Sequence, residues 1–396
     1  MSQLPLITSV FLNVTDSCNL RCPYCFVEQK PNYMSYQTAK DTADFLIRNA
    51  EKDGSIPAIN FFGGEPTLCW DSIIVPLTNY IRQEYGKPFE LSMTSNCTLL
   101  TEEHIKFLQE NDVGLLFSID GDKNTQNINR PKQNGRGSFP LLEDKIDLIS
   151  KSFPNVCFRS TLIPKTCQNL FHNIHFAHRH GYKHYFVVPN VFEEWDEEAR
   201  ATVQKEMRRF SDWVIQSFRK GKGMPIRFSD FEESFVKIQR INTAIVNDLF
   251  REEGRCGACA KCGLGSMRYG AVDWRGNVYA CQELVSPKGG SDNHFYIGSI
   301  YSGIDDNRRK ILMSSFEAKA NRTGKCEHCQ LNRICNGGCV ANNYMILGDV
   351  NSVPEVYCWW MNLLLDEAIY VSTELGGEQN QGFLEYWRMI HNGGRF

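Results

Sequence analysis

The sequence predicts an α/β fold, in which a partial (β/α)6 barrel of the TIM type is followed by a small cysteine-rich domain. Stretches of strand length and helix length alternate from residue 7 to about residue 220, and such alternation implies right-handed crossovers and a parallel sheet. One face of the predicted strands turns polar toward their C-terminal ends. Beyond residue 256 the cysteines become dense and regular patterns become short, which is typical of a small domain held together by ligand bonds.

Six strands are expected where β-branched and aromatic residues concentrate. They lie at 7–14, 57–62, 89–94, 114–119, 155–162 and 183–189. Helix-length stretches lie between and after them, at 35–53, 71–85, 102–111, 139–152, 168–180 and 196–220. Six such units fit either an open doubly wound sheet or part of a barrel.

The alternation of side chains along the strands favours the barrel. Phe11, Asn13 and Thr15 share one face of the first strand, and Ser118 and Asp120 share one face of the fourth. A parallel sheet covered by helices on both faces should be apolar on both. Polar side chains near the strand C-termini instead indicate an open lumen that holds a ligand, at the end where barrel active sites lie.

The chain divides into four predicted segments. The barrel occupies 1–220, a helical linker 221–255, the cysteine-rich domain 256–370 and a C-terminal segment 371–396. The last segment is expected to be a terminal helix that packs on the core. A docking site for a peptide is the alternative, built from Phe383, Tyr386, Trp387 and Met389.

Composition excludes several classes of protein. The 396 residues are 42% apolar and 22% charged, which excludes wholesale disorder. The net charge is −3 and no polybasic run occurs, so nucleic acid is not expected as a partner. The N-terminus has no basic region and no cleavage-like site, and no apolar run approaches ~18–20 residues. We therefore expect a cytoplasmic protein without a membrane span, in which clustered cysteines are metal ligands rather than disulfides.

The first cysteine cluster is Cys18-x3-Cys22-x2-Cys25, in the loop after the first strand. Soft thiolates select zinc or iron–sulfur over hard metals. A structural zinc site usually has four ligands, and no fourth Cys or His lies in this loop. Three ligands on a four-iron cluster would leave one iron open to a substrate or cofactor. A zinc site with a distant fourth ligand, and reactive or buried cysteines, are the alternatives.

This spacing resembles that of the radical S-adenosylmethionine (SAM) enzymes, whose CxxxCxxC loop carries a redox-active [4Fe-4S] cluster. The motif Gly63-Gly64-Glu65-Pro66 closes the second strand, 40 residues after the triplet. Glycines let a ligand approach the backbone, and a carboxylate can accept hydrogen bonds from an ammonium group. In the family this segment holds the methionine amino group of SAM. Thr94-Ser95-Asn96-Cys97 stands where relatives often have Thr-Asn-Gly.

The resemblance implies further contacts with SAM. Ser118 and Asp120 would bind the ribose hydroxyls, with capping of the strand end as the alternative. Tyr24 would lie near the adenine. Arg159 would bind the SAM carboxylate or the substrate backbone, and a structural ion pair is equally consistent with the sequence.

The second cysteine cluster has its own spacing, in which Cys256, Cys262 and Cys281 precede a CxxCx5Cx3C element and a closing cysteine. Eight thiols are enough for two four-thiolate iron–sulfur clusters, with two zinc ions as the alternative. The run resembles the SPASM extension of radical SAM peptide-modifying enzymes. By that resemblance one auxiliary [4Fe-4S] cluster takes Cys256, Cys262, Cys281 and Cys339, and the other takes Cys326, Cys329, Cys335 and Cys358. The five remaining cysteines, Cys69, Cys97, Cys157, Cys167 and Cys259, are expected to be small apolar fillers.

The resemblance also implies a reaction. The enzyme would cleave SAM reductively at the first of three [4Fe-4S] clusters, and the 5′-deoxyadenosyl radical would take a hydrogen from an unactivated carbon. Ile226–Asp230 resembles the stretch of anaerobic sulfatase-maturating enzymes that carries their catalytic Asp, so Asp230 would be the base. An N-cap formed with Ser229 is the alternative.

The leading prediction is a maturase that forms a thioether in a ribosomally made, Cys-containing peptide. The alternatives are an anaerobic sulfatase maturase that converts Cys or Ser to formylglycine, a maker of carbon–carbon cross-links (cyclophanes), and a non-enzymatic metal-binding module that recruits a partner. A peptide or protein substrate is expected as partner, together with a reductase or flavodoxin-type electron donor. Because the first strand begins near Ile7, any leader would be bound by a separate protein or by 371–396.

Overall fold

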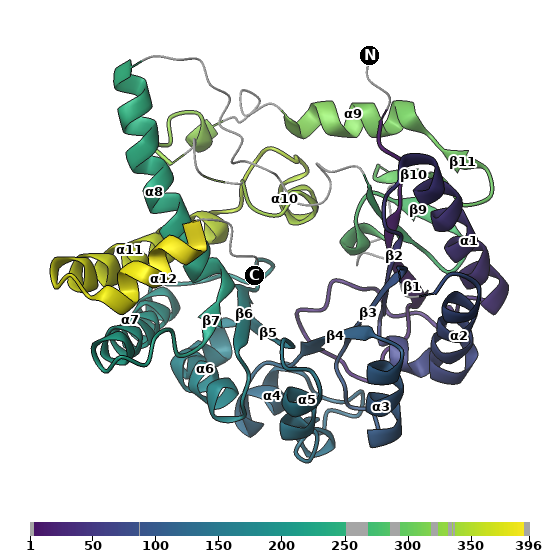
Figure 1. Cartoon of the computed structure of the whole chain (residues 1–396), viewed down its shortest axis with the longest axis horizontal. Coiled ribbons are helices and arrows are strands. Elements are labelled where there is room, and N and C mark those ends of the chain that lie inside the picture. The colour runs from purple at the N-terminus through teal and green to yellow at the C-terminus, as the bar shows by residue number, and fades with distance from the viewer. Residues whose placement is uncertain are drawn as a thin grey trace.

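The computed structural model describes residues 4–86, 88–250, 268–285, 294–317, 324–331, 335 and 337–391. Its strands form one sheet of 11, in the order β11-β10-β9-β8-β1-β2-β3-β4-β5-β6-β7 (Figure 1). From β1 to β7 neighbouring strands are parallel and follow the chain order. The sheet curves around the centre of the molecule with helices on its outer side. The predicted α/β class and parallel barrel sheet are confirmed.

The six predicted strands lie within two or three residues of their expected positions. They are β1 (Ser9–Thr15), β2 (Ala58–Gly63), β3 (Glu90–Ser95), β4 (Val113–Ser118), β5 (Cys157–Leu162) and β6 (His184–Pro189). The sequence did not predict β7 (Arg227–Phe228), because two residues are too few to show an alternating pattern.

The outer helices begin and end where local signals place them. They are α1 (Tyr36–Asp53), α2 (Val75–Glu84), α3 (Glu102–Glu110), α4 (Lys123–Asn129), α5 (Ile146–Ser152), α6 (Leu170–Arg179) and α7 (Glu197–Arg219). In α1 the Ser35 side chain caps the first turn and Gly54 ends the last in a left-handed conformation. The expected helix at 139–152 is broken, since only Phe139–Leu141 and α5 are helical, and α4 was not predicted.

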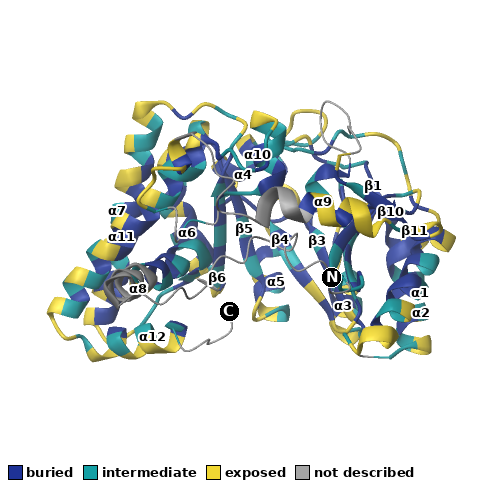
Figure 2. Cartoon of the chain, turned by 90° about the horizontal axis from the view of Figure 1, so that it is seen from above, coloured by how far each residue is buried: buried dark blue, intermediate teal, exposed yellow. Residues whose placement is uncertain are grey.

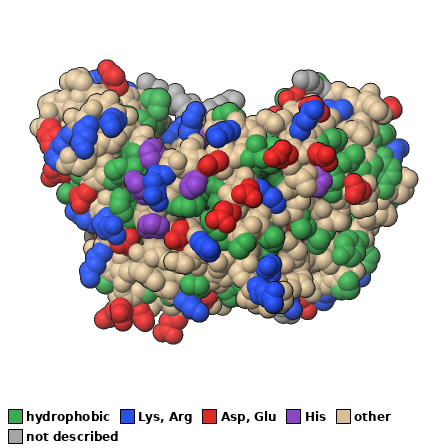
Figure 3. Space-filling view, turned by 90° about the horizontal axis from the view of Figure 1, so that it is seen from below, with side chains coloured by type: hydrophobic (Ala, Val, Ile, Leu, Met, Phe, Trp, Pro, Cys, Tyr) green, Lys and Arg blue, Asp and Glu red, His purple; other side chains and the backbone are tan. Residues whose placement is uncertain are grey.

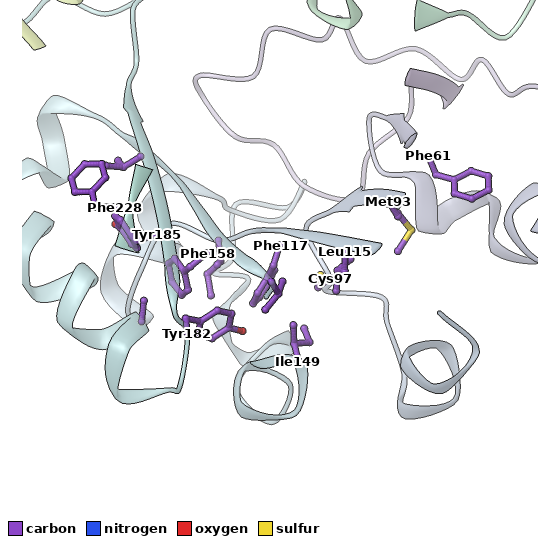
Figure 4. Packing of buried hydrophobic residues seen from close by; sticks show 14 of the residues in the cluster. Phe61, Met93, Cys97, Leu115, Phe117, Ile149, Phe158, Tyr182, Tyr185 and Phe228 are labelled. Carbon is purple, nitrogen blue, oxygen red and sulfur yellow. The ribbon is translucent and has the colours of Figure 1, made fainter. Parts of the chain in front are cut away.

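The core lies between the sheet and these helices. Figure 4 shows Phe117, Phe158, Tyr185 and Phe228 in a row across neighbouring strands, on the faces that point away from the lumen, with Phe61 at the far end beyond Met93. The rings of Phe158 and Tyr185 stack with centres 5.6 Å apart. Burying each such ring stabilises the fold by roughly 1.5–3 kcal/mol. Figure 2 shows the same division, with buried strands and with exposed residues on the outer sides of the helices.

The cysteine-rich segment shares the barrel's sheet. β8 (Tyr269–Val272) pairs in parallel with β1, and β9 (Asn277–Tyr279), β10 (Tyr296–Ser299) and β11 (Gly303–Ile304) extend the sheet in antiparallel fashion. The strand pairing with β1 means that the C-terminal part is built directly onto the first barrel strand. Cys256, Cys259 and Cys262 lie outside the described residues.

Helices of the C-terminal half lie on both sides of the molecule, most of them next to β6 and β7 and one next to β10 (Figure 1). They are α8 (Ser229–Phe250), α9 (Asp306–Glu317), α10 (Val340–Leu347), α11 (Glu355–Gly377) and α12 (Gln381–His391). α11 packs on α7 and α8, and it runs through the boundary predicted at 370. Phe383 and Ile390 of α12 are buried in the main core, so α12 is a terminal helix packed on the core.

The surface mixes charges of both signs. Figure 3 shows Lys and Arg interspersed with Asp and Glu on the face seen from below, without a continuous basic patch. Histidines gather on this face, and His175 and His178 of α6 contact the ring of Trp213. Among the described residues, no helix combines the length and the hydrophobicity that crossing a membrane requires.

Candidate active site

The first cysteine cluster lies in the loop between β1 and α1. Cys18, Cys22 and Cys25 are half-buried. Burial raises the pKa of the Cys18 thiol, and the charges of Glu65 and of the other two cysteines raise it further. Burial likewise raises the pKa of Cys22 to about 12. The structure therefore brings the three predicted ligands together, each partly shielded from solvent.

This donor set fits an iron–sulfur cluster. Enclosed thiols give up their protons to a metal, and soft thiolates suit iron–sulfur or zinc. Within the part of the chain that the structure describes, no three His, Cys, Asp or Glu side chains are spaced like ligands around a single metal ion. A four-iron cluster takes one thiolate on each iron, so its ligands stand farther apart than those of one zinc ion.

The two glycines at the end of β2 let the backbone there pack directly against the backbone at the start of the cysteine loop. A Cβ atom on Gly63 would lie 2.2 Å from the carbonyl oxygen of Thr15, and one on Gly64 would lie 2.2 Å from that of Ser17. The N–H of Gly64 donates to Thr15 at 2.8 Å and the N–H of Glu65 donates to Ser17 at 2.9 Å. These contacts hold the cysteine loop against the end of β2. From the sequence, these glycines were expected to let a ligand approach the backbone; in the structure it is another segment of the chain that approaches.

Glu65 is a buried carboxylate with several protein donors. Its Oε1 accepts from the hydroxyl groups of Thr67 at 2.6 Å and Ser95 at 2.8 Å, and its Oε2 accepts from the N–H of Asn96 at 2.8 Å. Burial raises the pKa of Glu65, while these hydrogen bonds act in the opposite direction. Because Oε2 has one protein donor, it keeps capacity for the ammonium group that was predicted as its ligand.

Asp120 links Tyr24 to Arg130, a residue that was not among the candidates from the sequence. Its Oδ2 accepts from the Tyr24 hydroxyl at 2.5 Å, and its Oδ1 lies 3.0 Å from Nε of Arg130. Asp120 and Arg130 are both buried, and the guanidinium carbon of Arg130 lies 5.6 Å from the centre of the Tyr24 ring. Asp120 also accepts from the N–H of Thr161 at 2.9 Å. Its carboxylate thus ties the cysteine loop to the ends of β4 and β5.

The inner face of the sheet carries polar groups near this network. Asn60 donates to Ser92 at 2.8 Å and accepts from Thr94 at 3.1 Å. Ser118, at the end of β4, is half-buried. Oδ1 of Asn13 is buried without a hydrogen-bond partner among the described residues. A buried acceptor without a partner fits a polar ligand at the lumen end of β1.

Arg159 and Asp230 lie close enough for their charges to influence each other. Arg159 donates to the Thr161 hydroxyl at 2.7 Å, and burial lowers its pKa while Tyr24, Asp120 and Glu283 act to raise it. Burial raises the pKa of Asp230 to about 6, Glu233 adds to the rise, and Trp360, Lys237 and Arg159 oppose it. Asp230 lies inside the first turn of α8, which begins at Ser229.

Cys157 lies near Arg159 and Asp230. It is half-buried, and burial raises its pKa to about 12, with Arg159 lowering it and Asp230 raising it. Of the other unassigned cysteines in the described residues, Cys69, Cys97 and Cys167 are buried in the core, as expected of apolar fillers.

The second cysteine cluster is partly described. Burial raises the pKa of Cys358, and the charges of Cys326, Cys335 and Cys329 add to the rise, so the structure brings these four predicted ligands together. Of the other predicted set, Cys281 is buried and Cys339 is half-buried. The sulfur of Cys339 lies 3.7 Å from Oε2 of Glu283, two residues after Cys281.

Three residues near these groups were not among the candidates from the sequence: Arg130, Glu283 and Trp360. Arg130 caps the C-terminus of α4, a seven-residue helix that the sequence did not predict. Glu283 stands two residues after a predicted ligand, and that proximity is a signal the sequence does contain. Trp360 lies in an aromatic run near the start of α11 that also suits a packed helix.

Comparisons with known proteins agree with this arrangement. The model of the radical SAM superfamily matches residues 12–177, from β1 to the end of α6. A cysteine-type anaerobic sulfatase-maturating enzyme of Clostridium perfringens is 22% identical over 353 residues, covering 85% of this chain and 89% of the relative.

Solved structures show the same fold. A structure of anSMEcpe with bound AdoMet and Cp18Cys peptide is 18% identical, covers 93% of this chain and 99% of its own, and has a TM-score of 0.69. Streptococcus suis SuiB bound to precursor peptide SuiA is 16% identical, covers 89% of this chain and 75% of its own, and has a TM-score of 0.54.

Proposed function

Because the chain is a radical SAM enzyme, with its radical SAM domain at residues 12–177, we propose that it is a maturase that oxidises a residue of a peptide or protein. The observation that carries the proposal is the buried network at the strand ends, in which Asp120 binds Tyr24 of the cysteine loop and lies 3.0 Å from Arg130, and in which Glu65 accepts from Ser95 and Asn96. Similarity over most of the chain to a sulfatase-maturating enzyme supports a polypeptide substrate.

The residues that would hold the cofactors come from the ends of several strands. Cys18, Cys22 and Cys25 would hold the SAM-binding [4Fe-4S] cluster, and Glu65 would accept from the SAM ammonium group through its Oε2. When bound, the cluster and SAM supply a 5′-deoxyadenosyl radical that removes a hydrogen atom from a carbon of the substrate. Ser118 and the Tyr24–Asp120 pair would bind the nucleoside, and the eight later cysteines would hold two auxiliary clusters.

Asp230 is the proposed base. A carboxyl group with a pKa of about 6 is mostly ionised at neutral pH, yet it is basic enough to accept a proton efficiently. It would take the proton that a substrate thiol, hydroxyl or amide N–H gives up during oxidation. Trp360 and the buried residues of α8 would shield this carboxyl group from water.

The finer reaction has two candidates. The leading one is a thioether in a ribosomally made, Cys-containing peptide, and a fold shared with a protein solved with its precursor peptide supports it. The second is conversion of a Cys to formylglycine in a sulfatase, and the sulfatase-maturating relative supports it. Both reactions begin with a cysteine in a polypeptide. In both, the substrate radical must give up an electron, and we propose that the auxiliary clusters and a flavodoxin-type partner accept it.

A mass-spectrometric assay separates these reactions. The reconstituted protein is incubated anaerobically with SAM, dithionite and one of two probes: the Cp18Cys peptide, or Cys-containing peptides encoded by short reading frames beside the gene. A thioether removes two hydrogens and keeps the sulfur, whereas formylglycine loses the sulfur and gains an aldehyde that reacts with a hydrazide. Cleavage of SAM that leaves both kinds of peptide intact would overturn both candidate reactions.

A further inference from the structure

A cavity in the C-terminal part of the sheet has no assigned role. It has a volume of about 880 Å³ and lies where β9, β10 and β11 adjoin the first turn of α9. Its lining includes Arg275, Asn277, Tyr296 and Arg308. None of these four residues belongs to the candidate active site. We call this space the edge cavity, because β11 is the last strand of the sheet.

The register of the sheet connects the edge cavity to the barrel lumen. Phe11 of β1 pairs with Asn60 on the inner face of the barrel and, on its other side, with Ala271 of β8. Ala271 pairs with Tyr279 of β9, and Tyr279 pairs with Tyr296 of β10. Because residues paired across strands share one face of a sheet, all five stand on the inner face. The edge cavity therefore continues the surface of the lumen.

Aromatic rings cover this face between the lumen and the edge cavity. The centre of the Phe11 ring lies 5.2 Å from that of Phe62 on β2 and 5.3 Å from that of Tyr269 on β8. The ring centres of Tyr279 and Tyr296 lie 5.8 Å apart. Tyr279 belongs to a small buried cluster on which Phe11 and Tyr296 pack. These five rings form an aromatic strip, a surface on which an extended peptide can lie.

Two guanidinium groups border the edge cavity. The guanidinium carbon of Arg308 lies 5.4 Å from the centre of the Tyr296 ring, and its Nη1 donates to the Tyr296 carbonyl oxygen at 3.2 Å. The guanidinium carbon of Arg275 lies 4.3 Å from the centre of the Trp274 ring. Within the described parts of the chain, neither arginine has a carboxylate oxygen within 4.0 Å of its nitrogens. Each guanidinium has five N–H donors, so most of them are available to a ligand.

The acidic residues at the start of α9 are bound to other groups. Oδ1 of Asp305 accepts from the N–H groups of Asn307 and Arg308, at 2.9 and 3.0 Å, and so caps the helix. Asp306 pairs with Arg309 at 2.8 Å. Neither carboxylate forms an ion pair with the two arginines of the edge cavity, which therefore present positive charge to a ligand.

We propose that the edge cavity binds an acidic side chain of the substrate polypeptide, on a segment that extends from the modified residue across β8, β9 and β10. The carboxylate of a Glu or Asp accepts from Arg275 and Arg308, and the residues between lie on the aromatic strip. The inference rests on the proposed function, since it requires a polypeptide substrate. Because ion pairs with exposed arginines contribute modestly, this contact sets the register of the peptide rather than most of its affinity.

The spacing of the strands predicts where the acidic residue lies in the substrate. Only β8 and β9 separate β1 from β10, so Phe11 and Tyr296 stand three strand spacings apart, or about 14 Å. An extended peptide spans about 3.3 Å per residue. The acidic residue is therefore expected at least about four positions away from the residue that is modified at the lumen.

A glutamate scan in the peptide tests the edge cavity. The probes are otherwise uncharged peptides with one Cys, in which a single Glu or Gln occupies each position in turn. At a position at least about four residues from the Cys, we expect the wild type to bind the Glu peptide about three- to tenfold more tightly than the Gln peptide. In the double variant Arg275→Gln and Arg308→Gln this preference should fall to about twofold or less. Arg388→Gln, at an exposed position of α12, is the control and should keep the full preference.

A reversal of charge covers poor folding of the double variant. With Arg275→Glu and Arg308→Glu together, a Lys at the same peptide position should bind more tightly than Gln, a gain that a damaged fold would not produce. A wild type without a preference for Glu at any position, or a double variant that keeps it, would overturn the inference, even where the peptides are modified.

Two further outcomes identify what has failed. Variants that slow only the reduction of the clusters by a flavodoxin, and that keep the preference for Glu, would mean that the edge cavity binds the electron donor instead of the substrate. A wild type that neither binds nor modifies any of the peptides would overturn the proposed function as well.

Discussion

At the residue scale, contacts between backbones position the candidate cluster. Thr15 and Ser17 lie directly before the cysteine triplet, and their carbonyl oxygens occupy the space that Cβ atoms on Gly63 and Gly64 would need. The buried carboxylate of Glu65 then joins this junction to Ser95 and Asn96. The arrangement of the three cysteines therefore depends on residues about 40 positions away in the sequence.

Replacing Gly64 with Ala should separate the cysteine loop from β2. The new Cβ would lie 2.2 Å from a backbone oxygen, which cannot move without disturbing the loop. We expect a loss of about 2–4 kcal/mol in the free energy of unfolding and poor incorporation of the first cluster. Urea unfolding and iron analysis measure both. Gly114→Ala, whose Cβ meets its nearest neighbour at 3.5 Å, is the control and should cost less than about 1 kcal/mol.

The pKa of Asp230 predicts two dependences on pH. Product formation should rise as pH increases through about 6, because the carboxylate must be ionised to accept a proton. Its folded-state pKa of about 6 lies above the ordinary value of 3.8, so the native state binds more protons between these values. Stability therefore falls as pH rises through this window.

Asp230→Asn separates catalysis from stability. The variant should lose the rise in activity near pH 6 and most of the product. It should also gain about 1–3 kcal/mol in the free energy of unfolding at pH 7.5, because an uncharged amide replaces a buried charge. Denaturation at pH 7.5 and a pH–rate profile measure the two effects. An unchanged pH–rate profile and an unchanged product yield would mean that Asp230 is not the base and only forms part of the first turn of α8.

At the scale of elements, the C-terminal helix α12 is held by a buried network. Glu232 of α8 is fully buried, pairs with Nε of Arg227 at 3.1 Å and accepts from the Tyr386 hydroxyl. Around it Phe218, Phe235 and Phe383 pack edge to face. This contact joins β7, α12 and α8, the helix whose first turn carries Asp230.

Removing one hydroxyl from this network measures its contribution. Tyr386→Phe should reduce the free energy of unfolding by about 1–3 kcal/mol, because a buried carboxylate loses a donor. Tyr33→Phe changes an exposed ring and should have an effect within about 0.5 kcal/mol. Equal stability of the two variants would mean that Arg227 alone satisfies Glu232.

Periodic elements were predictable, and short or irregular ones were not. Strands β1 to β6 have alternating or continuous apolar patterns, and α1 has a Ser cap and a closing Gly, so their local signals suffice. The pairing of β8 with β1 joins residues more than 250 positions apart, and no local pattern specifies such a contact. Arg130 was not among the candidates from the sequence, because no local pattern indicates that its side chain pairs with Asp120.

At the scale of the whole molecule, one sheet connects the candidate catalytic parts. β1 leads into the cysteine triplet and pairs with β8, which leads through β9 to Cys281 and Glu283. From the sequence, the cysteine spacings alone predicted two kinds of site, but not that they share a sheet. The shared sheet therefore holds the C-terminal part that carries Cys281 and Glu283 next to the strand that leads into the cysteine triplet.

Removing the first cluster should leave the others in place. In the variant with Cys18, Cys22 and Cys25 all replaced by Ala, the iron content should fall from about twelve to about eight atoms per chain, because one of three four-iron clusters is lost. SAM cleavage should be abolished. Retained cleavage would show that another site binds SAM, and a complete loss of iron would mean that the clusters assemble together.

The transfer of hydrogen from the substrate tests the central claim most directly. A Cys-containing peptide deuterated at its carbon positions is incubated with the enzyme, SAM and reductant, and the 5′-deoxyadenosine is analysed by mass spectrometry. The account predicts that deuterium appears in 5′-deoxyadenosine in step with oxidation of the peptide. Formation of 5′-deoxyadenosine without deuterium, beside an unchanged peptide, would contradict it.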